Sequence, residues 1–321
     1  MSFKVLIVIF VLLCTLGAGI FLTYKHLNNK FETGFTNLSV KSDPVPVFSK
    51  SANDVLNTSK PDLDGEFEKF RDVVISKKGS YGVYVKSYPN LRINGKWEVS
   101  GDTRNPVEFS YNSEKFLYGA SLFKTPVAIT LMKAIEAKKF SLDTKVRYTS
   151  ADFSDGTGDI NTTDYGTEYP LFEVLEKLLQ KSDNSAQNIL IRILGINYIG
   201  QTFKELGTSS RYYNENYLTP KDGVLVFESL VNSSIVDAES SAYILKLLDE
   251  TDFDDRIESG LGPDVRFSHK IGTDGSSWHD CGVASGANGV AVVCLLSSET
   301  NLGDFKEVSK ALGEFVGVLV R

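Results

Sequence analysis

The chain has 321 residues, a formal net charge of −7 at pH 7 and 42% hydrophobic residues. This is the composition of a globular protein with a substantial core. The acidic balance and the lack of a basic stripe argue against nucleic acid as a main partner. Three cysteines and three histidines without ligand spacing predict neither a disulfide scaffold nor a metal site. No phosphate loop or dinucleotide fingerprint is present, so we expect no cofactor.

An uncharged stretch of twenty residues lies near the N-terminus, at residues 5–24. Its length is sufficient for a helix that spans a bilayer, and no small-residue cleavage site stands out. We therefore expect an uncleaved single-pass membrane anchor, preceded by a short flank at residues 1–4. Lipoprotein attachment at Cys14 is a weaker interpretation. The lysines on the two sides of the stretch do not favour export by the positive-inside rule, so an external location has to be argued from the chemistry.

Residues 25–64 are polar and interrupted by prolines, which is typical of a tether. A folded domain is expected from residue 65 to residue 321. Its first predicted elements are a helix within 66–78 and strands at 80–88 and 107–113, with a turn-rich excursion between the two strands.

The remaining elements are predicted from apolar periodicity and turn signals. They are a helix at 125–140, an acidic loop at 149–170, helices at 171–180, 185–195, 219–232 and 239–250, strands at 266–272, 279–286 and 289–298, and a last helix at 305–320. This order predicts one α/β domain in which an antiparallel sheet takes strands from both ends of the chain.

Ser121 and Lys124 stand three residues apart at the head of the predicted helix 125–140. Residues at this spacing share one helix face. A lysine in an apolar setting has its neutral form favoured by desolvation, and a neutral amine beside a hydroxyl can accept its proton. The pair therefore predicts an activated serine nucleophile. Alone, the pattern is weak, and a helix N-cap serine followed by a lysine in the first turn is the favoured interpretation until other motifs are considered.

Two further tripeptides complete a set. Ser182-Asp183-Asn184 lies in a predicted helix–helix junction, and Lys270-Ile271-Gly272 lies on a predicted strand. S-x-x-K and S-D-N each occur once in the chain, and the three motifs stand in this order. Over residues 66–321 the chain therefore resembles the class A β-lactamases and the low-molecular-weight penicillin-binding proteins. The resemblance implies an antiparallel five-stranded sheet flanked by helices, plus an all-helical lobe.

The resemblance also implies roles for the residues of the motifs. Ser121 would be the nucleophile and Lys124 its activating base. Ser182 would relay a proton to the leaving nitrogen, and Asn184 would hold the substrate amide and help fix Lys124. Lys270 would present positive charge to the substrate carboxylate and to Ser182.

The same resemblance places Gly272 and Thr273 beside the substrate, with the backbone N–H groups of Ser121 and Thr273 as the oxyanion hole. A helix N-terminus offers such groups where negative charge develops. Ile271 departs from the pattern, because a hydroxyl residue is usual there. We expect weaker carboxylate binding unless Thr273 compensates.

Glu215 is the only acid in the short stretch before Thr219-Pro220. In class A β-lactamases a longer loop there carries the glutamate that activates the deacylating water. A D,D-peptidase-like enzyme, in which acylation outruns deacylation, is therefore favoured. A true β-lactamase with Glu215 as the deacylation base is the close alternative.

Two other hypotheses remain. The chain could be a non-catalytic module that binds cell-wall peptides, or a Ser-His-Asp hydrolase that uses His279 and Asp280. The favoured interpretation is a monomeric serine hydrolase of the cell membrane, with its catalytic domain outside the cytoplasm. Its expected partners are a β-lactam or a peptidoglycan peptide, and the membrane through residues 5–24.

Cys281 and Cys294 fall on neighbouring predicted strands, on the same sheet face. A four-residue loop at 286–289 puts them directly opposite one another, and a two-residue Asn288-Gly289 loop puts them diagonal. We predict buried free thiols, because a disulfide requires the first register.

Overall fold

The structure, a computed structural model, describes residues 61–321. The predicted anchor at 5–24 and nearly all of the predicted linker 25–64 lie outside the described residues. Among the helices from residue 61 onward, none combines the length and apolar character needed to cross a membrane.

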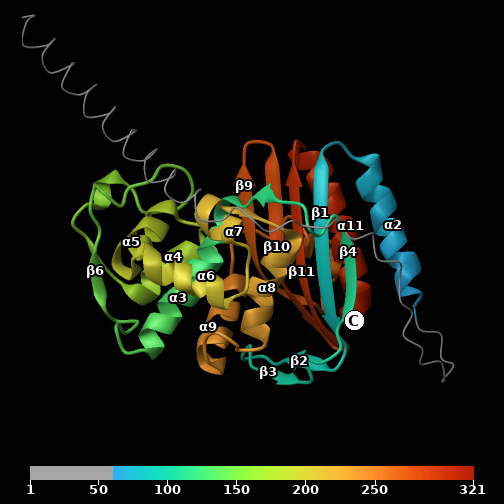
Figure 1. The fold of residues 1–321 in the computed structure, drawn as a ribbon, viewed down its shortest axis with the longest axis horizontal. Helices are drawn as coiled ribbons and strands as arrows, with labels where there is room; N and C mark the ends of the chain where they lie inside the picture. The colour runs from blue at the N-terminus through green and yellow to red at the C-terminus, as the bar shows by residue number, and fades with distance from the viewer. Residues whose placement is uncertain (1–60) are drawn as a thin grey trace, which may run out of the picture. The chain divides into compact units, whose positions relative to one another are not determined.

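A five-stranded antiparallel sheet forms the centre of the fold, in the order β4–β1–β11–β10–β9 (Figure 1). Two strands come from the first part of the domain and three from its end, which confirms the predicted sheet. The strands are β4 (Val107–Tyr111), β1 (Ser80–Tyr88), β11 (Gly289–Ser298), β10 (Ser277–Gly286) and β9 (Arg266–Asp274).

Both faces of the sheet are covered, so β11 is a continuous run of apolar residues whose side chains point alternately to the two faces. Helices α2 (Leu63–Ser76) and α11 (Leu302–Val320) pack on one face, and α8 (Pro220–Val231) packs on the other (Figure 1). On β11, Val293 belongs to the core under α11, whereas Val292 belongs to the core under α8.

Most of the remaining helices form the lobe that meets the edge strand β9. They are α3 (Lys124–Glu136), α4 (Leu171–Gln180), α5 (Asn184–Leu194), α6 (Ile196–Glu205), α7 (Ser210–Glu215) and α9 (Ala238–Asp249). The single turn α10 (Glu258–Leu261) packs against α11 instead, with Leu261 in the core under that helix. Helices α6, α7 and α10 were not expected from the sequence. Gly195, with φ 78°, is both the C-cap of α5 and the N-cap of α6. A glycine usually predicts the end of a helix, but here a second helix follows it directly.

Three two-stranded sheets complete the fold: β2 (Leu91–Ile93) with β3 (Val99–Gly101), β5 (Leu117–Tyr118) with β8 (Tyr217–Leu218), and β6 (Lys145–Arg147) with β7 (Glu168–Pro170). The pair β5–β8 matters most for function, because β5 leads directly into the segment that carries Ser121.

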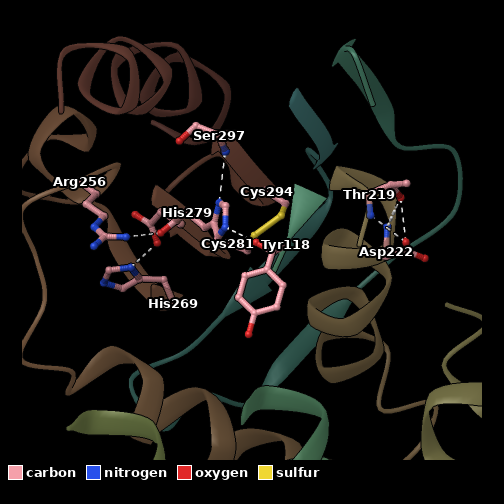
Figure 2. Close-up of a disulfide and its surroundings, with 10 residues drawn as sticks. Tyr118, Thr219, Asp222, Arg256, His269, His279, Cys281, Cys294 and Ser297 are labelled. Carbon is pink, nitrogen blue, oxygen red and sulfur yellow. Dashed lines mark hydrogen bonds and ion pairs between the residues drawn. A yellow bond between two sulfur atoms is a disulfide. The ribbon is translucent and has the colours of Figure 1, made fainter. Parts of the chain in front are cut away.

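Cys281 and Cys294 form a disulfide between β10 and β11 (Figure 2). They are directly opposite in the register, and their Cα atoms lie 4.0 Å apart. The predicted free thiols are therefore wrong, although the first of the two registers is right. The loop is shorter than that register assumed, because Gly286 pairs with Gly289.

The disulfide lies on the face covered by α8 and constrains that helix. A Cβ on Gly223 of α8 would meet Cys294 Sγ at 2.3 Å and Cys281 Sγ at 3.3 Å. The helix can approach the sulfurs only because this position has no side chain.

Candidate active site

Ser121 sits in a 3₁₀ turn, Ala120–Phe123, that runs directly into α3. Lys124 is the first residue of α3, and its Nζ donates a 2.8 Å hydrogen bond to Ser121 Oγ. Ala120, just before the serine, has a left-handed φ of 47°. Such strained backbone is held only where the surrounding structure fixes it, and here it turns Ser121 toward the cleft.

Lys124 is almost fully buried and is held from the opposite side by the Ser182 motif. Its Nζ donates to the Ser182 carbonyl at 2.8 Å, to Asn184 Oδ1 at 2.7 Å and to Ser182 Oγ at 3.3 Å. Burial lowers the pKa of Lys124 to about 8, although the negative charge of Asp183 opposes this shift. A substantial fraction of the amine is therefore neutral near pH 8, as a base for Ser121 requires.

The junction between α4 and α5 positions the second motif. Ser182 has a left-handed φ of 55°, and the following Asp183 caps α5 by accepting the Ala186 N–H at 2.7 Å. Asp183 also accepts the N–H groups of Asp159 and Ile160, at 2.7 and 2.8 Å. The acidic loop is thus tied to the motif by backbone donors.

Lys270 and Gly272 occupy the edge strand β9 and face the serine turn. A Cβ on Gly272 would meet the Gly119 carbonyl oxygen at 2.8 Å, so only glycine lets β9 approach the chain just before Ser121. Lys270 is fully buried. Desolvation, together with the positive charges of Lys124 and Arg256, lowers its pKa well below the usual value.

Lys270 makes less contact with the motif residues than predicted. Its Nζ donates to the Ile271 carbonyl at 3.2 Å and lies 5.8 Å from the centre of the Phe253 ring. Within residues 61–321 no hydrogen bond joins it to Ser182. The predicted interaction with Ser182 is therefore not part of this structure.

One cavity of about 360 Å³ is lined by four of the predicted residues, but not by Ser182, Lys270 or Gly272. Ser121, Lys124, Asn184 and Thr273 all line it. Ser121 and Thr273, predicted to supply the oxyanion hole, thus face the same space. Their assignment as N–H donors to a substrate oxygen remains a prediction.

Glu215 does not line this cavity. Its side chain is 53% exposed and pairs with Arg211, with Oε2 and Nη2 3.2 Å apart. The next residue, Asn216, lines the cavity instead, with a left-handed φ of 55° and its Nδ2 donating to the Ala120 carbonyl at 2.9 Å. The cavity wall therefore carries the amide of Asn216, which cannot act as a base, in place of the Glu215 carboxylate that the sequence suggested.

Arg256 is a candidate site residue that the sequence did not reveal. Its Nη2 donates to Thr273 Oγ1 at 2.7 Å and its Nη1 to the Gly272 carbonyl at 3.0 Å. The guanidinium lies 5.6 Å from the ring centres of both Trp278 and Phe305. It is only 4% exposed, and this burial lowers its pKa. Nothing in the acid-rich stretch around Arg256 distinguishes it from a solvated arginine.

The Ser-His-Asp hypothesis is wrong, because both ring nitrogens of His279 are used by the backbone (Figure 2). Nδ1 accepts the Ser297 N–H at 3.2 Å, so Nε2 carries the proton and donates to the Tyr118 carbonyl at 2.6 Å. Burial lowers the pKa of His279 to about 4, and the ring is neutral. Asp280 pairs with His269 instead, at 2.7 Å.

Comparison with known proteins agrees with this geometry. Residues 67–316 match the family model described as "Beta-lactamase enzyme family". Over 209 residues the chain is 28% identical to β-lactamase SME-1 of Serratia marcescens, covering 60% of this chain and 68% of that protein.

Two solved structures share the fold. A β-lactamase from Sphaerobacter thermophilus DSM 20745 superimposes with a TM-score of 0.68 at 21% identity, over 79% of this chain and 96% of its own. A PBP-A variant, solved as an acyl-enzyme complex with penicillin G, gives a TM-score of 0.68 at 19% identity, over 82% of this chain and 98% of its own.

Proposed function

The chain belongs to the β-lactamase enzyme family of serine hydrolases, and we propose that within this family it acts as a D,D-peptidase-like acyl-enzyme on D-alanyl-D-alanine-type peptides. β-Lactams would acylate the same serine. The observation that carries the proposal is the position of Lys124 Nζ, 2.8 Å from Ser121 Oγ and 2.7 Å from Asn184 Oδ1.

The chemistry follows from these contacts. Neutral Lys124 accepts the Ser121 proton as Oγ bonds to the substrate carbonyl carbon. The carbonyl oxygen becomes negative beside the start of α3, where free N–H groups favour it. As the C–N bond breaks, Ser182, within 3.3 Å of Lys124 Nζ, passes a proton to the leaving amine. Water then cleaves the ester and restores the serine.

Arg256 and Thr273 supply the substrate carboxylate site in this proposal. The hydroxyl missing at Ile271 is present two residues on, at Thr273, and the 2.7 Å bond fixes it beside a guanidinium. An arginine beside a hydroxyl presents several donors to one carboxylate.

The preference for peptidase over β-lactamase behaviour rests on the wall of the cavity. Glu215 faces Arg211 and solvent, and the amide of Asn216 stands in the wall. Without a positioned carboxylate base there, deacylation would be slow and the acyl-enzyme would persist. The likeness to SME-1 favours the alternative, a β-lactamase that activates water with another group.

We also propose that the catalytic domain is held outside the cytoplasmic membrane by residues 5–24. The support is the uncharged twenty-residue stretch and the location of cell-wall substrates. Protease added to intact cells should remove the domain, and full protection would contradict this topology.

The function is tested by mixing the full chain in detergent with a fluorescent penicillin and following its intact mass over time. A persistent adduct on Ser121 supports a D,D-peptidase-like enzyme. An adduct that forms and is rapidly lost supports a β-lactamase. No adduct at any time supports a binding module.

A further inference from the structure

A second cavity of about 260 Å³ adjoins the reaction centre on the side of Ser182. It shares Ser121 and Thr273 with the first cavity, and it also contains Ser182. Ser182 is the residue that would deliver the proton to the leaving group. The second cavity is therefore where a leaving group would lie.

Part of the wall of this cavity is apolar. Its apolar side chains are Phe253, Ile271, Trp278 and Leu302, and they come from four separate segments of the chain. Trp278 lies opposite Thr273 in the β9–β10 register, and Leu302 is the first residue of α11. Ile271 is only 8% exposed, whereas Leu302 is 36% exposed. The wall thus runs from a buried inner end to an open mouth.

Positive charge lies at one end of this apolar wall. Arg256 lines the cavity and donates to Thr273. Lys270 stands behind the wall, 5.8 Å from the Phe253 ring. Asp255 also lines the cavity, but its carboxylate is paired with Lys306 Nζ at 2.7 Å. The cavity therefore offers donors for one carboxylate next to a surface that gains free energy when an apolar side chain covers it. A carboxyl-terminal amino acid with an apolar side chain carries both of these groups on its α-carbon.

We propose that the leaving group of the natural substrate is an amino acid with an aliphatic or aromatic side chain larger than methyl. The proposal rests on the proposed function, and it replaces the terminal alanine of a D-alanyl-D-alanine peptide by a larger apolar residue. The Ser121 oxygen bonds to the carbonyl of the penultimate residue, and the amide C–N bond breaks. The Ser121 proton passes through Lys124 and Ser182 to the nitrogen, and the free apolar amino acid departs.

Ile271 acquires a role in this account. A hydroxyl at this position would donate to the carboxylate but would interrupt the apolar wall. Isoleucine completes the wall, while Thr273 and Arg256 bind the carboxylate. The departure from the family pattern thus marks a change in the leaving group rather than decay of the site.

The test uses diacetyl-lysyl-D-alanyl-D-X peptides with X as Ala, Leu or Phe, and measures release of X by the full chain in detergent. We expect kcat/KM for Leu or Phe to exceed that for Ala by about ten-fold or more, since a pocket distinguishes one methylene by about 10- to 200-fold. Leu302→Ser should bring the Leu-to-Ala ratio toward one. Ile271→Thr should also lower this ratio.

Ile196→Ser is the matched control, because Ile196 is 53% exposed and lies on α6, away from both cavities. It should keep the wild-type ratio. Thermal melting of each variant identifies loss of folding. Because Leu302 is more exposed than Ile271, Leu302→Ser should disturb folding less than Ile271→Thr.

Equal rates for the three peptides, or an unchanged ratio in Leu302→Ser, overturn the inference. Penicillin labelling of Ser121 in the same preparation distinguishes failure of this inference from failure of the proposed function. Labelling without a leaving-group preference overturns this inference alone. Absence of both labelling and peptide turnover overturns the proposed function and this inference together.

Discussion

Arg256 donates a 2.7 Å hydrogen bond to the hydroxyl of Thr273, so a buried cation and a hydroxyl stand side by side on the strand where Ile271 lacks one. The pair connects the turn before α10 to the edge of the sheet. It explains how a site without the usual hydroxyl could still recognise a carboxylate.

Replacement of Arg256 tests this pair. Arg256→Lys should lower kcat/KM for carboxylate-bearing substrates by about 10- to 100-fold, because a lysine cannot bond Thr273 and a carboxylate through a planar fork. The wild-type enzyme should lose a similar factor when the substrate carboxylate is replaced by a neutral amide. If the variant and the amide substrate show additive losses, Arg256 does not bind the carboxylate.

Lys124 should control the pH dependence of acylation. Its pKa is lowered to about 8 by burial, and only the neutral amine accepts the Ser121 proton. The acylation rate should therefore rise from pH 6 through pH 8 and level off above it. Stopped-flow measurement with a fluorescent penicillin gives the profile.

The matching variant is Lys124→Ala, which should slow acylation by at least about 100-fold. Loss of the inflection near pH 8 in the residual rate would support the assignment. A wild-type profile without an inflection between pH 7 and 9 would count against Lys124 as the base.

Glu215→Gln should change the deacylation rate by less than about two-fold. The carboxylate is exposed, pairs with Arg211, and does not line the cavity, and exposed ion pairs contribute little. The measurement is the decay of the penicillin adduct by intact mass. A ten-fold slower decay in the variant would instead assign Glu215 to water activation.

Reduction of the Cys281–Cys294 disulfide should destabilise the domain. The bridge closes a loop over a sequence separation of 13. Chain-entropy arguments assign up to about 3 kcal/mol to such a loop, and a sheet that already fixes the register will show less. Alkylation of the unfolded chain should modify two more cysteines after reduction. Equal alkylation with and without reductant would show that the thiols are free.

His269 should make stability depend on pH in the alkaline range. Its burial opposes protonation, but Asp280 at 2.7 Å and Glu258 together raise its pKa to about 9. Because the folded-state pKa exceeds the unfolded value, the contribution is complete below about pH 6.5 and is lost as pH rises through 9. A difference of one pKa unit corresponds to about 1.36 kcal/mol, so His269 contributes up to about 3 kcal/mol to the free energy of unfolding.

The check is the free energy of unfolding of the wild type and of His269→Asn between pH 6 and 10. The difference between the two should shrink as pH rises, which separates His269 from the lysines that titrate in the same range. A constant difference would mean that His269 is neutral in the folded protein.

The sheet and most of the helices could be predicted because their signals are local. Strand β11 is an uninterrupted apolar run that begins directly after a turn, and α4 has an apolar face at helical spacing. Short elements such as α7 and α10 lack enough residues for a period to show. The glycine at 195 has the same local signal whether it ends a helix or joins two of them.

Within the site, sequence determined the members of the three motifs, because S-x-x-K, S-D-N and K-x-G are contiguous patterns. Ser121, Lys124 and Asn184 do converge, with two hydrogen bonds below 3 Å. The orientation of Glu215 and the partners of His279 were not accessible, since residue spacing does not fix which way a loop or strand side chain points.

What the sequence by itself determined is the chemistry of the nucleophile and the antiparallel core that supports it, since both are encoded in neighbouring residues. Only the tertiary structure placed Arg256 on Thr273, turned Glu215 away from the cavity and paired Cys281 with Cys294. These three facts depend on how distant segments pack, on burial and on register. Such quantities are set by the whole fold, and no short stretch of sequence contains them.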